Sequence, residues 1–190
     1  MIYTAEQALE FINQRYKDKK TNKPFIVAVD GRCASGKTTF AKMLGAEIIH
    51  TDDFYKPKNE KGMLEISLYS GNFDLNRFKS EIVAPLLKGE PFEYGIFDCG
   101  MQKITKTVKV SDLDFIVVEG SYSQHEDLGE YADIKLFFDI SNEEQQKRIL
   151  ARNGINAKQG FDNIWIPAEE RYFERYSIKE KANIIVTTEV

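Results

Sequence analysis

Short apolar runs alternate with amphipathic stretches along most of the chain. The runs at residues 25–31, 47–51, 114–120, 134–140 and 182–188 are rich in β-branched and aromatic residues. Continuous apolar runs of this kind are typical of strands that are buried on both faces of a sheet. Because helical patterns lie between them, we predict an α/β fold with a mainly parallel central sheet and helices on both faces.

Helical spacing fills the stretches between these runs. Residues 4–17 place Ala8, Leu9, Ile12 and Tyr16 on one face, which predicts an amphipathic helix. The same spacing recurs in three later groups of apolar residues, which are Phe40, Met43 and Leu44, then Leu75, Phe78, Ile82 and Leu86, and then Tyr172, Phe173 and Tyr176.

Other residues mark where helices should begin or end. Pro85 should kink or end the helix that contains it. Ser141 and Glu144 have the spacing of a capping box, which would open a helix running to about Arg152. Pro167 stands where a first helical turn would start.

Two stretches depart from the alternation of strands and helices. Residues 91–98 and 102–110 have the pattern of an extra antiparallel strand pair. Residues 59–72 are polar with glycines nearby, and we interpret them as a functional loop. No change of composition marks a domain boundary, so we expect residues 1–190 to form a single domain.

Composition and charge narrow the classes of protein. The chain has 190 residues, of which 42% are hydrophobic and 29% charged, as in a globular domain. Its net charge of −4 argues against a broad nucleic-acid-binding surface but leaves room for a local basic pocket. No apolar run reaches the roughly 18 residues of a membrane span, and the first residues lack the pattern of a signal peptide.

The cysteine content indicates a reducing compartment. Cys33 and Cys99 are the two cysteines, and they form no disulfide framework. We therefore expect a reduced, cytoplasmic enzyme or binding protein that acts without nucleic acid or membrane partners. Assembly as a homo-oligomer is compatible with this expectation.

The motif with the most weight is Gly-Arg-Cys-Ala-Ser-Gly-Lys-Thr at residues 31–38, which matches the phosphate loop G-x-x-x-x-G-K-[ST]. A buried strand precedes it and a helix follows, so a chance glycine-rich turn is the weaker interpretation. Backbone N–H groups of such a loop face a phosphate chain, and its lysine reaches the β- and γ-phosphates. The nucleotide-binding residues expected here are Gly31, Ala34, Ser35, Gly36, Lys37, Thr38 and Thr39.

Acidic residues stand at the ends of two other predicted strands. Asp52 and Asp53 follow the strand at 47–51, where one of them could accept the proton of an attacking hydroxyl; the alternative is that they only cap the next turn. Adjacent side chains on a strand point to opposite faces, so only one should face the site. Glu119 ends the strand at 114–120 and, with Thr38, is expected to hold Mg²⁺; its alternative is a solvated loop acid.

These features separate the classes of phosphate-loop protein. The sequence has no D-x-x-G and no N-K-x-D motif, and the nearest match, at residues 22–25, fails at its last position. A guanine-nucleotide switch is therefore disfavoured. A chain of 190 residues also leaves no room for motor modules.

The order of motifs resembles that of uridine kinase-like P-loop kinases. The matching segments are GRCASGKTT, TDDFY, NFD, VVEG and the helix with Arg148 and Arg152. The segment IIHTDDFYKP is also similar to nicotinamide riboside kinases, and phosphoribulokinase and pantothenate kinase belong to the same group. The resemblance implies a P-loop NTPase fold, a three-layer sandwich with a small lid.

The resemblance also implies an activity, which is ATP- and Mg²⁺-dependent phosphorylation of a primary hydroxyl of a small molecule. By position, Asp52 matches the catalytic base, and Lys37, Arg148 and Arg152 match the groups that stabilise the transferred phosphoryl group. The residues that match the acceptor site are Tyr55, Phe73, Asp74, Asp98 and Gln102. Asp74 is equally suited to cap the following helix, and the two arginines could instead be solvated.

Two departures from the family pattern concern the acceptor. Uridine kinases carry a histidine that reads the pyrimidine, whereas the segment at 97–103 has none, and Gln102 is the residue that could replace its hydrogen bond. The lid at 153–160 is short, with Lys158 as its cation. His50 and His125 lie elsewhere, and we interpret His50 as a packed strand residue.

The sequence thus favours a kinase for a nucleoside such as uridine or cytidine. One alternative is a kinase for another ribose-bearing or alcohol metabolite, such as nicotinamide riboside. A second alternative is a nucleotide-binding regulatory protein with little phosphotransfer.

Overall fold

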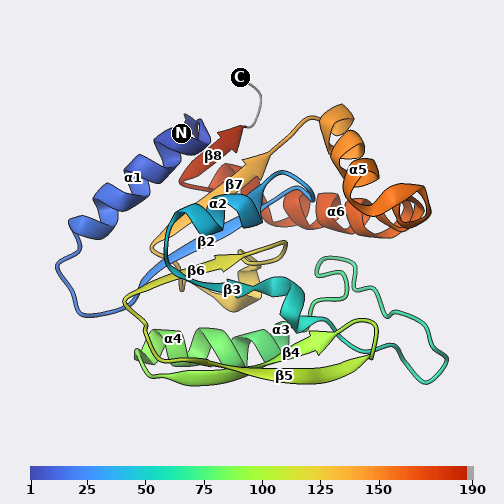
Figure 1. Cartoon of the computed structure of the whole chain (residues 1–190), viewed down its shortest axis with the longest axis horizontal. Helices are drawn as coiled ribbons and strands as arrows, with labels where there is room; N and C mark the ends of the chain where they lie inside the picture. Colours follow the sequence, from blue (N-terminus) through green and yellow to red (C-terminus); the bar gives the residue numbers. More distant parts are fainter. Residues whose placement is uncertain (188–190) are drawn as a thin grey trace.

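The computed structural model describes residues 1–187 and has a six-stranded sheet at its centre (Figure 1). The strand order is β1-β8-β7-β2-β6-β3, and all of its pairings are parallel. The strands are β1 (Ile2–Tyr3), β2 (Phe25–Gly31), β3 (Glu47–His50), β6 (Phe115–Glu119), β7 (Ile134–Asp139) and β8 (Ile184–Thr187). The predicted parallel sheet is confirmed. The sequence did not predict β1, because a strand of two residues has no recognisable pattern. Residue 188 of the last predicted strand lies outside the described residues.

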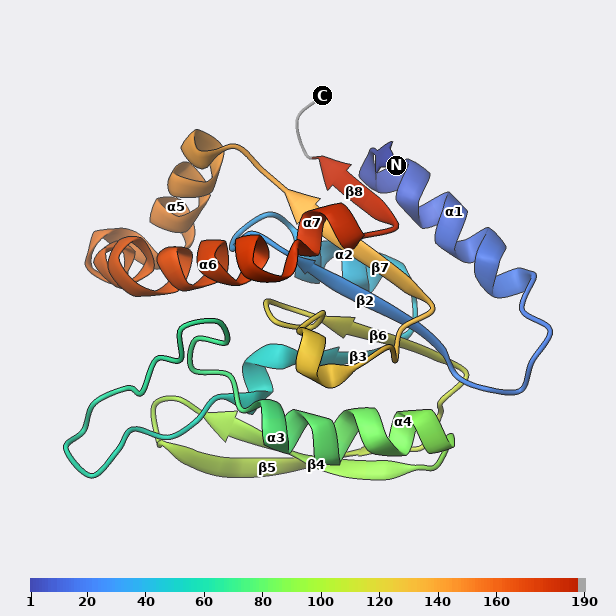
Figure 2. The same ribbon diagram turned by 180° about the vertical axis from the view of Figure 1, so that it is seen from behind.

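Helices cover both faces of this sheet, because alternate residues of its strands point to opposite sides. On β2, Val27 and Val29 pack in one core and Ile26 and Ala28 in the other. The first core is closed by α1 (Ala5–Lys17) and α2 (Lys37–Met43), and the second by α3 (Leu75–Phe78), α4 (Ala84–Lys88), α6 (Ile166–Tyr176) and α7 (Ile178–Lys181) (Figures 1 and 2). The result is the three-layer arrangement that the sequence predicted.

The helix through Pro85 does not end there but runs on to Lys88. A π turn, η2 (Lys79–Val83), precedes the proline, and the Ala84 N–H donates to the carbonyl five residues back. The wider turn accommodates a residue that lacks an N–H and crowds the preceding turn. The distortion expected at Pro85 therefore lies just before it, and the helix continues.

Pro167 follows the same rule, because the π turn η4 (Phe161–Trp165) precedes it. The preceding helix α5 (Asn142–Gly160) begins at Ser141, whose side chain accepts from the Glu144 N–H. The Glu144 carboxylate binds Arg148, so only one half of the predicted capping box forms. Residues 153–160 of the lid are helical except at Gly154, where φ is +76° and the helix breaks.

A second sheet lies apart from the first. Its strands β4 (Phe92–Asp98) and β5 (Lys103–Val110) are antiparallel, as predicted. Tyr94 of β4 stacks on Phe54 of the short helix η1 (Thr51–Phe54), with ring centroids 5.4 Å apart. This contact fixes the turn that follows β3.

Two other segments complete the outline. The 3₁₀ turn η3 (Glu126–Leu128) joins β6 to β7. The loop between η1 and α3 extends on the same side as the junction of α5 and α6, beside the ends of β3 and β6 (Figure 1). None of the helices in residues 1–187 combines the length and apolar character of a membrane span.

Candidate functional site

The phosphate loop connects β2 to α2, and its glycines are required by its shape. A Cβ on Gly31 would lie 2.2 Å from the carbonyl oxygen of Phe138, and φ is +130° at this residue. Gly36, with φ of +106°, turns the chain into α2. The Lys37 amine donates to the carbonyls of Gly31 at 2.6 Å and Arg32 at 2.9 Å, which holds it inside the loop.

The acid at the end of β6 meets the loop. The Thr38 hydroxyl donates to Oε1 of Glu119 across 3.1 Å. The same oxygen lies 2.5 Å from Nδ1 of His50, and this hydrogen bond raises the pKa of His50. His50 is thus more than the packed strand residue expected from the sequence. Its pairing opposite Glu119 on the parallel strands β3 and β6 is the signal that would have found it.

The residues present fit a magnesium ion. Mg²⁺ usually takes one or two carboxylates from a protein and completes its shell with water and substrate phosphates. Thr38 and Glu119 provide such a partial set beside the loop. No cluster of three or more His, Cys, Asp or Glu residues suited to a metal occurs within residues 1–187.

The acidic pair lies in a turn rather than on a strand. β3 ends at His50, and Asp52 and Asp53 both belong to η1, so strand alternation does not separate them. Asp52 is exposed, and its Oδ1 accepts the hydroxyl of Tyr55 at 2.6 Å. Asp53 is half-buried, and burial raises its pKa, with His50 and Glu119 among the charges that act on it.

Tyr55 is held from both ends. Burial and the nearby Asp52 keep its pKa well above the usual value, so the hydroxyl remains a donor to Asp52. Its ring stacks on Trp165 of η4, with centroids 6.3 Å apart and an interplanar angle of 27°. The sequence did not single out Trp165 because no motif surrounds it, yet it joins η4, which follows the lid, to the expected acceptor side.

The Phe73–Asp74 pair divides into a core residue and a cap. Phe73 is 0% exposed and packs on Phe78 and Tyr122, so its position does not support the expected role in the acceptor site. Asp74 is partly exposed, and its Oδ1 accepts from the Arg77 N–H at 3.1 Å. The predicted helix cap is confirmed. The partial exposure of Asp74 is compatible with a second role in the acceptor site.

The segment expected to read a base is tied up in its own turn. Asp98 Oδ1 accepts the N–H groups of Gly100 and Met101, each at 2.8 Å. Gln102 donates to the carbonyl of Cys99 at 2.5 Å and accepts from the Lys58 N–H at 2.8 Å. Both ends of its amide are therefore engaged, which disfavours the predicted replacement of the missing histidine by Gln102.

The two lid arginines lie against the phosphate loop. Arg148 pairs with Glu144 at 2.9 Å and donates to the carbonyl of Ala34 at 3.4 Å. Arg152 Nη2 lies 3.7 Å from the Cys33 sulfur. The four-residue spacing places both on one face of α5, as the sequence predicted.

The lid cation Lys158 lies further along α5 and forms an ion pair with Asp162 at 2.5 Å.

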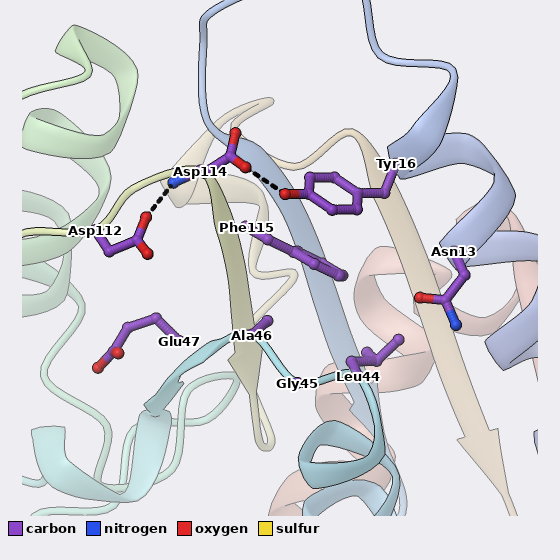
Figure 3. A pocket seen from close by; sticks show the side chains of 9 residues that line it. All are labelled: Asn13, Tyr16, Leu44, Gly45, Ala46, Glu47, Asp112, Asp114 and Phe115. Carbon is purple, nitrogen blue, oxygen red and sulfur yellow. Dashed lines mark hydrogen bonds between the residues drawn. The ribbon is translucent and has the colours of Figure 1, made fainter.

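A pocket at the opposite edge of the sheet is separate from the candidate nucleotide site (Figure 3). It lies at the amino ends of β3 and β6, and its lining includes the carboxylates of Glu47, Asp112 and Asp114. Asp114 turns toward Tyr16, as Figure 3 shows. This acidic lining would repel a phosphate chain, so the pocket is no rival for the nucleotide site.

A second hollow lies at the carboxyl ends of β7 and β8, beside the phosphate loop. Its lining is Arg32, Asp139, Ile140, Ser141, Asn142 and Thr187.

Comparison with known proteins bears on this arrangement. The chain is 24% identical over 191 residues to a uridine kinase of Ureaplasma parvum serovar 3, covering 88% of each protein. It is 24% identical over 207 residues to a pantothenate kinase of Listeria monocytogenes serotype 4a, covering 93% of this chain and 62% of the relative. No protein-family model matches the chain.

Solved structures show the same fold. A possible uridine kinase from Bacillus stearothermophilus matches with a TM-score of 0.72 at 21% identity, over 95% of this chain and 98% of that one. The YGR205w protein matches with a TM-score of 0.57 at 13% identity, over 97% and 93%. Together the similarities confirm the resemblance to uridine kinase-like P-loop kinases and support a kinase for a small metabolite.

Proposed function

We propose that the chain transfers the γ-phosphoryl group of ATP to a primary hydroxyl of a small, ribose-bearing metabolite, in a Mg²⁺-dependent reaction. The observation that carries the proposal is the contact between Thr38 and Glu119 at 3.1 Å, beside Lys37 and at the same sheet edge as Asp52. A phosphate loop, a metal-binding acid and an exposed carboxylate are the parts that phosphoryl transfer to an alcohol requires.

Each residue has a separate task in this proposal. Asp52 accepts the proton of the attacking hydroxyl, and the Tyr55 hydroxyl orients its carboxylate. Lys37 and the arginines over the loop stabilise charge on the transferred group, while ADP leaves. Mg²⁺ bound by Thr38 and Glu119 would supply positive charge next to the phosphates.

The test is a panel of acceptors scored by ADP release. Nucleosides, nicotinamide riboside and pantothenate would each be incubated with ATP and the purified chain. ADP release that requires an acceptor with a ribose primary hydroxyl supports the proposal. Tight ATP binding without acceptor-dependent release would instead favour a nucleotide-binding regulatory protein.

Changing the metal-binding residues should alter the magnesium requirement. We expect Thr38→Ala and Glu119→Gln each to raise the Mg²⁺ concentration for half-maximal activity, because each removes an oxygen or a charge that the ion would use. The measurement is a Mg²⁺ titration of the initial rate at saturating ATP. Glu47→Gln, an exposed acid at the other end of β3, is the matched control and should leave the requirement unchanged. If both variants show the Mg²⁺ dependence of the unmodified chain, neither residue binds the ion.

Selectivity for the acceptor should rest on its sugar more than on its base. No histidine stands in the segment 97–103, and the Gln102 amide is engaged by Cys99 and Lys58. We therefore expect uridine, cytidine and other ribosides to differ only modestly in kcat/KM. Strict use of uridine alone would contradict this part of the proposal.

Asp74 is the residue to which we assign a hydrogen bond with the ribose hydroxyls of the acceptor, and Asp74→Asn tests this contact without removing the helix cap. Asparagine caps helices as well as aspartate does, so the start of α3 should be preserved. A hydrogen bond to a charged group contributes about 1.5–3 kcal/mol, and its loss should raise KM for ribosides roughly 10- to 100-fold. Thermal unfolding of the variant is the control for the cap. An unchanged KM would leave Asp74 with the capping role alone.

A further inference from the structure

The Glu169 side chain is buried where α6 meets the phosphate loop. It lies in the first turns of α6 and is 6% exposed. Its Oε2 accepts the backbone N–H of Cys33 at 3.0 Å, and its Oε1 accepts the hydroxyl of Ser121. One carboxylate therefore joins α6, the phosphate loop and the segment that follows Glu119.

The charges around Glu169 are mixed. Lys37 is the cation that acts on it, while Asp30, at the end of β2, is a second buried acid that opposes its charge. Burial raises the pKa of Glu169 more than these contacts lower it. The carboxylate is thus held by two hydrogen bonds in a buried site, with the charge of Lys37 nearby.

A phosphate chain bound by the loop would lie close to the Glu169 carboxylate. The backbone N–H groups of a phosphate loop are the donors that bind phosphate oxygens, and Cys33 lies within this loop. The Cys33 N–H, which directly precedes the expected nucleotide-binding residues Ala34–Thr39, holds the Glu169 carboxylate against this loop. Phosphates entering the loop would add negative charge beside this buried acid, and two like charges repel strongly away from water.

We propose that the buried carboxylate of Glu169, which the Cys33 N–H holds against the loop, opposes the charge of bound phosphates and thereby lowers the affinity of the loop for the phosphate donor. This inference rests on the proposed function of the loop. Because Glu169 belongs to α6, the same hydrogen bond also joins α6 to the loop.

The test measures binding rather than catalysis. Dissociation constants for ADP and for inorganic pyrophosphate would be measured by calorimetry, with EDTA present to remove divalent ions. Glu169→Gln keeps the size and an acceptor oxygen but removes the charge. We expect it to bind both probes about tenfold more tightly than the unmodified chain, because a like charge near the site is gone.

Two variants serve as controls for this result. Glu169→Asp keeps the charge near the loop, so it should not reproduce the tighter binding. Glu170→Gln makes the same charge change one residue along α6, where the side chain is 51% exposed and pairs with Arg32 at 3.1 Å. Water and salt screen that position, so we expect less than a twofold change.

The outcomes separate this inference from the proposed function. Tighter binding of both probes by Glu169→Gln alone supports the inference. Unchanged or weaker binding in a variant with an unchanged melting temperature overturns it, while ADP binding by the unmodified chain still supports the phosphate-loop function. If neither the unmodified chain nor Glu169→Gln binds ADP or pyrophosphate, both proposals are wrong.

Discussion

Replacing Lys37 with alanine should lower kcat by about 10²-fold or more, in line with the loss of other groups that stabilise transition-state charge. The Lys37 amine is held inside the loop by the carbonyls of Gly31 and Arg32 and is only 8% exposed. It is therefore already positioned where the phosphates would bind, and no other lysine of α2 can take its place. The measurement is steady-state turnover with ATP and an acceptor identified from the panel.

Lys42→Ala is the matched control for this variant. Lys42 lies on the same helix but is exposed, so its removal changes the net charge of α2 without touching the loop. We expect turnover close to that of the unmodified chain. Comparable turnover in Lys37→Ala and Lys42→Ala would contradict the assignment of residues 31–38 as a catalytic phosphate loop.

Asp52→Asn should have the second large effect, a fall in kcat of about 10²–10⁴-fold, which is the usual contribution of a positioned proton acceptor. The dissociation constant for ATP should change little, because the proposed donor site lies on the phosphate loop. Asp52 is exposed and accepts the Tyr55 hydroxyl at 2.6 Å, so asparagine can keep that hydrogen bond while losing the basic oxygen. Turnover kinetics and nucleotide binding on the same preparation separate the two effects.

Asp53→Asn is the comparison that assigns the base. Asp53 is half-buried, within reach of the charges of His50 and Glu119, which places it on the side of the proposed metal site. We expect its variant to retain much more turnover than Asp52→Asn and to respond to added Mg²⁺. An inactive Asp53→Asn together with a fully active Asp52→Asn would transfer the role of base to Asp53.

Local patterns predicted much of the fold. The phosphate loop is a continuous motif, and the strand β2 that precedes it is buried at all of its positions, so both could be identified from neighbouring residues. The contact of Thr38 with Glu119 was also accessible, because parallel strands end at the same edge of a sheet. The path of the helix through Pro85 could not be predicted, since a π turn leaves no clear mark in the sequence.

The contacts that were missed are distant in sequence. Glu169 and Cys33 are 136 residues apart, and their meeting depends on how α6 packs on the sheet. Trp165 reaches Tyr55 because the helix that contains the lid continues through η4. Such contacts follow from tertiary packing, which a motif read along one chain does not encode.

The exposed edge of the two-stranded sheet affects whether copies of the chain associate with one another. Within residues 1–187, β5 pairs only with β4, so its outer edge offers unpaired backbone groups to any extended segment. Lys103, Lys106 and Lys109 are all exposed along this strand. Their charges oppose edge-to-edge association of two such strands, because lysines of both copies would be brought together. The hairpin is thereby protected against growth into an extended intermolecular sheet.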